Sequence, residues 1–149
     1  ITDEGIKNLT NIVSLKLSCN DNITDKGLKC LINIQELKIM LCKRITDESF
    51  KYLVNIERLR LGNNINITNN GLKRLMKVKS LDLSSDSLIT NEGIKHMTTI
   101  KKLILSFNKK ITDNGIKHLT NIEELHICLN KKITDAGIKP LINIKKLVR

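Results

Sequence analysis

Aromatic residues are almost absent from this sequence of 149 residues, which holds no tryptophan, one tyrosine and two phenylalanines. Proteins that bind single-stranded nucleic acid stack the bases on aromatic side chains, so a stacking platform of this kind is largely excluded. The chain contains no run of 18 apolar residues, which excludes a membrane-spanning helix. The glycine-rich phosphate-binding motifs and the His-Glu-x-x-His metal-binding motif are also missing.

Cysteine occurs four times, at Cys19, Cys30, Cys42 and Cys128. Secreted disulfide scaffolds carry cysteine at a higher density, and the closely spaced cysteine and histidine pairs that bind zinc do not occur here. We therefore expect reduced thiols, a cytoplasmic or nuclear location, and no metal ion or other cofactor.

A triplet of Ile-Thr-Asp or Ile-Thr-Asn recurs every 22 residues, at Ile1, Ile23, Ile45, Ile67, Ile89, Ile111 and Ile133. A fixed period of this length is typical of a solenoid, in which each unit packs against its neighbours. No insertion interrupts the period, so we expect one domain over residues 1–149 with seven units, the last of them truncated. Solenoids need polar capping units, and neither terminal unit has one. We therefore expect further repeats in the parent chain or end-to-end self-association.

Counted from the isoleucine of the triplet as position 1, apolar residues occupy positions 1, 6, 9, 12, 15 and 17 of every unit, apart from Arg149 at position 17 of the last one. Positions 15 and 17 show the alternation of a strand with one buried face, which predicts a strand over positions 14 to 18. Positions 6, 9 and often 10 predict a helix of about two turns over positions 3 to 10, with the threonine at position 2 as its N-cap. Asparagine at position 11 in five units predicts a left-handed residue that ends this helix.

The segment from Ile12 to Asn20 has the pattern Ile-x-x-Leu-x-Leu-x-x-Asn and resembles the LxxLxLxxN segment of leucine-rich repeats. In that family the last residue of the segment hydrogen-bonds to backbone groups inside the turn and forms a ladder along the solenoid. The ladder residues here would be Asn20, Cys42, Asn64, Asp86, Asn108 and Asn130. An ionised aspartate only accepts hydrogen bonds, so we expect the serines around Asp86 to supply the missing donors.

The segment from Cys42 to Asp47 is similar to the Cys-x-x-Ile-Thr-Asp junction of the cysteine-containing class of leucine-rich repeats, best known behind F-boxes in ubiquitin ligases. The 22-residue unit is shorter than the repeat of that class and lacks its second Cys-Pro loop. Bacterial internalins share the unit length and an Ile-Thr-Asp triplet, but their register after the ladder asparagine differs by one residue. The chain therefore resembles the cysteine-containing class more closely.

This resemblance implies an α/β fold, namely a right-handed leucine-rich-repeat solenoid, or horseshoe, with parallel strands on the concave face and short helices on the convex face. It also implies a non-enzymatic protein-interaction scaffold that binds its partner through the strand-lined face. If the role follows the class, the chain would recognise a substrate within a ubiquitin-ligase-like assembly.

The net charge of +11 is concentrated on the strand side, where positions 13, 14, 16, 21 and 22 hold 15 basic and six acidic residues. We therefore expect a protein partner with an acidic surface. Position 16 changes along the chain from basic to largely apolar, and position 19 adds large apolar residues, which predicts an apolar patch for contact with the partner. The candidate partner-binding residues are Lys16, Lys38, Arg58, Arg60, Lys102, Ile104, Phe107, His126 and Leu129.

The alternative is a basic module that binds nucleic acid or another acidic surface, because a strongly basic strand face meets the first electrostatic criterion for it. Only five of the 26 basic residues are arginine, which disfavours bidentate recognition of bases and phosphates. Enzyme activity has weaker support. His96 and His118 occupy equivalent positions without a third ligand in register, and the His126 and Cys128 pair lacks an orienting group.

Overall fold

The computed structural model describes residues 1–64, 66–85 and 88–149. Seven strands follow one another along the chain: β1 (Ser14–Ser18), β2 (Glu36–Met40), β3 (Arg58–Gly62), β4 (Ser80–Asp82), β5 (Lys102–Ile104), β6 (Glu124–His126) and β7 (Lys146–Val148). Seven short helices alternate with them: α1 (Asp3–Ile6), α2 (Asp25–Leu28), the 3-10 helix η1 (Asp47–Lys51), α3 (Asn69–Leu72), α4 (Asn91–Ile94), α5 (Asp113–Ile116) and α6 (Asp135–Ile138).

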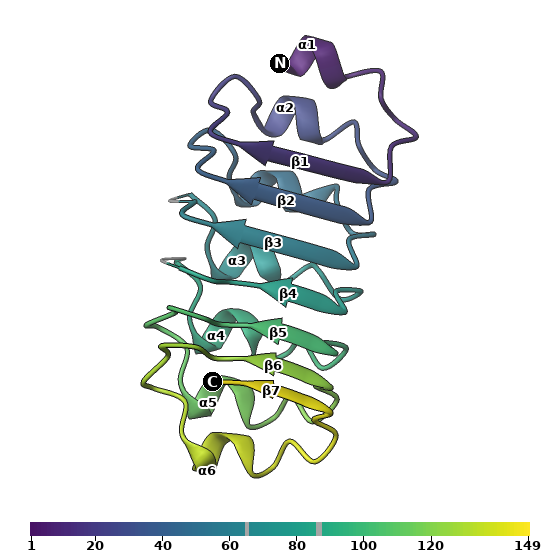
Figure 1. Cartoon of the computed structure of the whole chain (residues 1–149). Helices are drawn as coiled ribbons and strands as arrows, with labels where there is room; N and C mark the ends of the chain where they lie inside the picture. The colour runs from purple at the N-terminus through teal and green to yellow at the C-terminus, as the bar shows by residue number, and fades with distance from the viewer. Residues whose placement is uncertain (65, 86–87) are drawn as a thin grey trace.

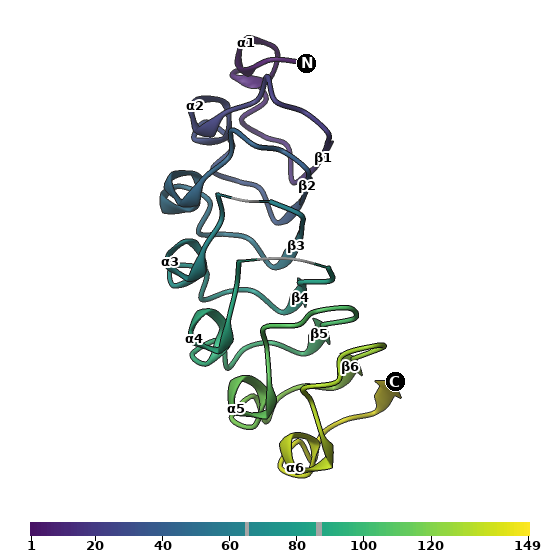
Figure 2. The same cartoon turned by 90° about the vertical axis from the view of Figure 1, so that its left-hand side faces the viewer.

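The strands form one parallel sheet in the order of the chain, and paired residues are one unit apart, as Leu37 is from Leu15 and from Leu59. Figure 1 shows this sheet as a ladder with the helices behind it. In the perpendicular view of Figure 2, the column of helices lies on the outer side of a gentle curve and the strands lie on the inner side. The predicted solenoid is confirmed. None of the described helices is long and apolar enough to cross a membrane.

The core lies between the sheet and the helices and is formed by the six apolar positions of the unit. Leu37, Leu81 and Leu125 of the strands are completely buried, as is Phe50 of η1. Packing is weaker in the terminal units, where Leu147 of β7 is exposed. The core is thus a continuous column shared between neighbouring units.

The helices are shorter than the sequence predicts. Each α-helix has four residues, about one turn, and the chain then returns to the sheet through successive three-residue turns. In the second unit, the Leu31 amide donates to the Leu28 carbonyl, and the Ile34 amide donates to the Leu31 carbonyl. These turns bury positions 9 and 12 but leave position 10 outside. The apolar residues Ile32, Val54, Met76 and Ile142 at position 10 are therefore exposed.

Asparagine at position 11 also differs from the prediction, because none of these residues has a positive φ. Their side chains instead link neighbouring units. The Asn33 Nδ2 atom donates to the Thr10 carbonyl at 3.0 Å, and Asn121 Nδ2 donates to the Thr98 carbonyl at 2.9 Å. A hydrogen bond to the preceding unit, rather than a left-handed backbone, accounts for asparagine at this position.

The ladder at position 20 forms as the resemblance implies. Asn64 Nδ2 donates to the Ile39 carbonyl at 2.7 Å, and Asn64 Oδ1 accepts from the Cys42 amide at 3.1 Å. Cys42 fits the same interior place, where its thiol donates to the Met40 carbonyl at 3.3 Å. Burial raises the pKa of the Cys42 thiol, so the thiol stays protonated at neutral pH. Asp86 lies outside the described residues.

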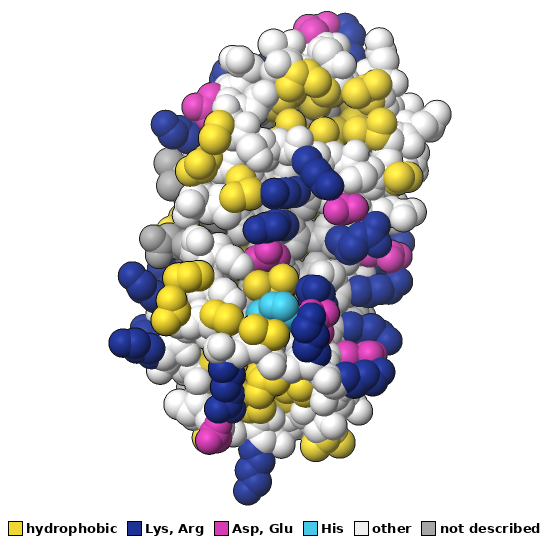
Figure 3. All heavy atoms as spheres, viewed as in Figure 1, with side chains coloured by type: hydrophobic (Ala, Val, Ile, Leu, Met, Phe, Trp, Pro, Cys, Tyr) yellow, Lys and Arg dark blue, Asp and Glu magenta, His cyan; other side chains and the backbone are white. Residues whose placement is uncertain are grey.

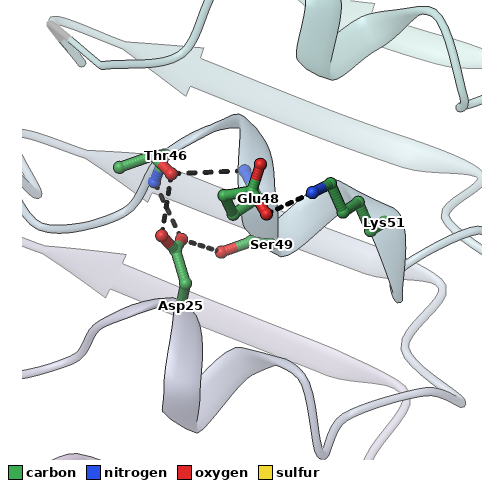
Figure 4. A network of polar contacts seen from close by, with 5 residues as sticks. All are labelled: Asp25, Thr46, Glu48, Ser49 and Lys51. Carbon is green, nitrogen blue, oxygen red and sulfur yellow. Dashed lines mark hydrogen bonds and ion pairs between the residues drawn. The ribbon is translucent and has the colours of Figure 1, made fainter.

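The Ile-Thr-Asp triplet forms a second ladder that the sequence analysis missed. Each aspartate or asparagine at position 3 hydrogen-bonds with the threonine of the next unit. Asp25 accepts from the Thr46 amide at 2.9 Å and from Thr46 Oγ1 at 2.7 Å (Figure 4). Thr46 Oγ1 in turn accepts from the Glu48 amide and caps η1, as predicted for threonine at position 2. The triplet therefore joins units as well as starting helices.

Glycine at position 5 is explained by this second ladder. A Cβ atom on Gly93 would lie 2.5 Å from Asn69 Oδ1, and one on Gly71 would lie 2.6 Å from Asp47 Oδ1. In the α-helical units, glycine lets the carboxylate or amide of the preceding unit approach the helix this closely. The third unit has Ser49 instead, whose hydroxyl donates to Asp25 in Figure 4, and its helix is the 3-10 helix η1.

Candidate protein-binding surface

The strand-lined face presents positions 14 and 16 of every unit. These positions hold six basic residues and three acidic ones, a net charge of +3 with histidine neutral. The three acidic side chains all form ion pairs with cations on the same face. Arg58 lies 3.6 Å from Glu36, Arg60 Nε lies 3.0 Å from Asp82, and Lys102 lies 3.1 Å from Glu124. The face is therefore less cationic than the sequence indicates.

Three cations lie side by side at the N-terminal half of this face. Lys16 of β1 is in register with Lys38 of β2, and Lys38 is in register with Arg60 of β3. Arg60 is paired with Asp82, but among the described residues no carboxylate pairs with Lys16 or Lys38. These side chains line a shallow hollow of about 250 Å³ that continues past Asp82 to Ile104.

Glu124 is the centre of an ionic cluster at the C-terminal half. Its carboxylate lies 2.9 Å from Lys146, 3.1 Å from Lys102 and 2.6 Å from His126 Nε2. Hydrogen bonds from Lys146, His126 and Lys102 lower the pKa of Glu124 to about 2. The cluster holds His126 and Lys102 in place beside the apolar residues of this half.

Position 19 follows each strand and has an unusual backbone. Its φ is positive in all six complete units, at Cys19, Leu41, Asn63, Ser85, Phe107 and Leu129. The left-handed region favours glycine and asparagine, and it costs about 1–2 kcal/mol for other residues. Even so, the exposed fraction is 44% for Leu41, 54% for Phe107 and 67% for Leu129. Large apolar side chains thus occupy a strained position where their surface faces solvent.

Phe107 and Leu129 form an apolar rim together with Ile104. The Phe107 amide donates to the Cys128 carbonyl at 2.8 Å, which places Phe107 beside Leu129 of the next unit. Ile104 is in register with His126 in the sheet. Figure 3 shows the face as a whole, with basic side chains across the middle and apolar side chains above them, below them and toward the left edge. We call Ile104, Phe107 and Leu129 the apolar rim.

The structure therefore places the nine candidate residues in two groups on one face. Lys16, Lys38, Arg58 and Arg60 line the hollow, and Ile104 stands at its far end. The C-terminal half of the face holds the other four, Lys102, His126, Phe107 and Leu129. The sequence analysis missed the acidic residues Asp82 and Glu124, which fix cations of this face. Their signal was present, since each lies opposite a basic residue one unit away.

A larger hollow lies elsewhere, on the flank where each chain segment enters its strand. It measures about 730 Å³ and is lined by position 13 residues and their neighbours. Three of its four lysines are already paired with glutamate, Lys79 with Glu57 at 3.0 Å, and Lys101 and Lys145 with Glu123 at 2.9 and 2.7 Å. This flank therefore takes up part of the basic charge that the sequence assigned to the strand side.

Catalytic groups are not assembled on the strand-lined face. His126 is bound to Glu124, so it does have an orienting group, contrary to the sequence analysis, but nothing in the geometry activates the Cys128 thiol as a nucleophile. Among the described residues, no three histidine, cysteine or acidic side chains are placed to hold a metal ion. The face consists of charged and apolar contact groups.

Comparisons with known proteins agree with this geometry. The model of the leucine-rich-repeat family matches residues 8–32, 96–119 and 118–141. No curated protein matches the chain significantly. Among solved structures, an internalin C2 (inlC2) from Listeria monocytogenes is 25% identical, with a TM-score of 0.73 over 99% of this chain and 64% of that one. An internalin (inlF) from the same organism is 22% identical, with a TM-score of 0.65 over 95% of this chain and 49% of that one.

This chain therefore spans about half to two thirds of the length of these two internalins. The match to the family model falls in the first two and the last three units, and the described residues of the two units between them form the same strand and turns. By its repeat, its sheet and its matching segments, the chain is similar to leucine-rich-repeat proteins.

Proposed function

We propose that this chain is a protein-interaction scaffold that binds a protein partner through its strand-lined face, with the apolar rim as the anchor. Leucine-rich-repeat proteins generally act as interaction scaffolds, which supports this class of function. Protein interfaces are centred on a few apolar or aromatic anchors surrounded by polar groups. The apolar rim, bordered by Lys102 and His126, has this composition.

The observation that carries the proposal is the backbone of Phe107. The side chain is large, aromatic and more than half exposed, and its φ of 62° is strained for any residue other than glycine or asparagine. Glycine or asparagine at this position would relieve the strain, at the loss only of the part of the ring that is buried. Backbone strain of this kind concentrates at functional sites, where it is maintained because the strained residue contacts a ligand or partner.

The competing function, binding to nucleic acid, has weaker support in the geometry. Four of the six basic residues on the strand-lined face are paired with acidic neighbours, namely Arg58, Arg60, Lys102 and Lys146. Phe107 is the one aromatic residue on this side of the chain, so successive bases would find no stacking surface. A phosphate backbone would meet a face with a net charge of only +3.

The proposal includes a more specific role, the recognition of a substrate for a larger assembly. Similarity of the Cys42–Asp47 junction to the cysteine-containing class points to presentation of a bound substrate within a ubiquitin-ligase-like assembly. Four free cysteines are compatible with a reducing cytoplasmic or nuclear compartment. Recovery of a ubiquitin-ligase core subunit with the full-length protein from its native source would support this role, and recovery of the partner without one would remove it.

The proposal is tested by capture of the partner from the native source, followed by affinity measurements. Phe107→Ala should lower the affinity at least tenfold, about 1.4 kcal/mol. Tyr52→Ala is the matched control, because it removes a similarly exposed aromatic side chain on the helix side. Equal affinities of wild type and Phe107→Ala would contradict the proposal.

Nucleic-acid binding is assayed in parallel with generic RNA and DNA at two salt concentrations. We expect any binding to vanish near physiological salt, because it would depend on summed charge alone. Tight binding that survives this salt, is lost in a Lys16/Lys38/Arg60→Glu triple variant and is unchanged by Phe107→Ala would favour the competing function.

A further inference from the structure

The hollow on the strand-lined face changes its chemistry from one end to the other. At one end it is lined by Lys16, Lys38 and Arg60, and at the other by Ile104, which belongs to the apolar rim. Asp82 lies between the two ends and holds Arg60 with an ion pair of 3.0 Å. A ligand that follows this hollow therefore meets cations first and an apolar surface last.

The cationic end contains unmet charge. Lys16 and Lys38 lie directly opposite each other on adjacent strands, and like charges in this arrangement repel. Other cations of the face have carboxylate partners, but no described carboxylate pairs with these two. Their repulsion would be relieved by two negative charges from a ligand, which is the charge complementarity that specific interfaces use.

The distance between the ends limits the ligand further. Ile104 lies four strands beyond Lys16 and three beyond Lys38, and strands are about 4.8 Å apart, so the ends are about 14–19 Å from each other. An extended polypeptide advances about 3.3–3.6 Å per residue and covers this distance in about four to six residues. Asp82, which is buried on β4 beside the strand of Ile104, disfavours an acidic residue next to the apolar end of such a segment.

We propose that the partner of this chain presents an extended segment with two acidic residues over Lys16 and Lys38 and a large apolar residue, about four to six residues away, on the apolar rim. The inference rests on the proposed function, because it names the chemistry of the partner at the same face. The two ends of the hollow have different roles in binding. The apolar rim supplies the desolvated anchor, and the lysine pair fixes the position of the segment along the hollow.

The test is a selection from random 12-residue peptides displayed on phage, carried out on the purified chain near physiological salt. We expect the enriched sequences to share two acidic residues separated by about four to six residues from a phenylalanine, leucine or methionine. Enrichment of sequences without this spacing of charge, or no enrichment over an uncoated support, would overturn the inference.

A charge exchange with one synthesised consensus peptide makes the assignment specific. Lys16→Glu/Lys38→Glu should weaken binding of the peptide at least tenfold, and replacing the two acidic residues of the peptide by lysine should restore it. Lys29→Glu/Lys73→Glu is the matched control, with the same change of charge on exposed helix-side residues, and should leave binding unchanged.

Equal loss in both double variants would assign the effect to net charge and overturn the inference. Failure of this selection is distinguishable from failure of the proposed function, because Phe107→Ala is measured on the captured partner itself. If binding of the captured partner depends on Phe107 but not on Lys16 and Lys38, the proposed scaffold function holds and only the inference of an acidic segment is overturned.

Discussion

Position 19 shows at the residue scale how function and stability oppose each other in this protein. Six consecutive units place a non-glycine residue in the left-handed region there, and three of these residues are large, apolar and exposed. The sequence gives almost no signal of this conformation. Asn63 is the only residue of a type that often adopts it, and no glycine marks the position. Exposure of Phe107 could be predicted from the repeat, but its strain could not.

Removing the strain should stabilise the fold independently of binding. We expect Phe107→Gly to be more stable than Phe107→Ala by about 1 kcal/mol, because both lose the ring but only alanine keeps a Cβ in the left-handed region. At Lys109, which has no positive φ, alanine should be at least as stable as glycine. Urea unfolding of the four variants checks the prediction, and the same order at both sites would contradict it.

At the element scale, the turn between units is fixed by polar contacts that a pattern of apolar residues does not reveal. The alternation at positions 15 and 17 correctly predicted the start of every strand, but β4, β5, β6 and β7 end at position 16, two residues earlier than predicted. The helices were predicted too long, because apolar residues at positions 6, 9 and 10 fit both a two-turn helix and the successive turns that actually form. The triplet was recognised as a helix start, but its contact with the next unit depends on the stacking of units and is not visible within one unit.

The close approach at glycine gives an element-scale prediction with an internal control. Gly93→Ala places a Cβ 2.5 Å from Asn69 Oδ1 and 2.8 Å from Ile89 Cγ2 and should lower the free energy of unfolding by about 1–3 kcal/mol. Gly5→Ala meets only Ile1 Cγ1, at 3.4 Å, and no position 3 side chain among the described residues.

Gly5→Ala should therefore be neutral or stabilising by up to about 1 kcal/mol, as expected for alanine in place of glycine in a helix. The difference between the two variants, measured by urea unfolding, isolates the contact between units from helix propensity. If Gly93→Ala were as stable as Gly5→Ala, the second ladder would not restrict position 5.

At the scale of the whole molecule, charge is distributed in rows along the solenoid because each unit repeats its charged positions. Two carboxylates near the C-terminal end compensate for neighbouring lysines. Lys145 and Lys101 lower the pKa of Glu123 to about 2, and Lys146, His126 and Lys102 do the same for Glu124. The sequence showed the excess of basic residues, but the pairing depends on register between units, which only the three-dimensional stack defines.

These two glutamates should make stability depend on pH in the acidic range. Their folded-state pKa values lie below the ordinary value of 4.5, so their contribution is present above that pH and is lost as the pH falls toward 2. A Glu123→Gln/Glu124→Gln variant should lose less stability than wild type between pH 4.5 and 2. Urea midpoints across this range provide the measurement, and the difference should shrink at 1 M salt because the carboxylates are near the surface.

The binding of a protein partner at the strand-lined face is tested most directly by photo-cross-linking from the rim. A benzophenone amino acid at position 107 keeps an aromatic group at the anchor, and the same amino acid at position 52 provides an exposed helix-side control. In extracts of the native source, position 107 should yield one protein adduct that excess wild-type chain suppresses and excess Phe107→Ala does not. Adducts from position 52 alone, or adducts of position 107 with nucleic acid in place of protein, would contradict the account.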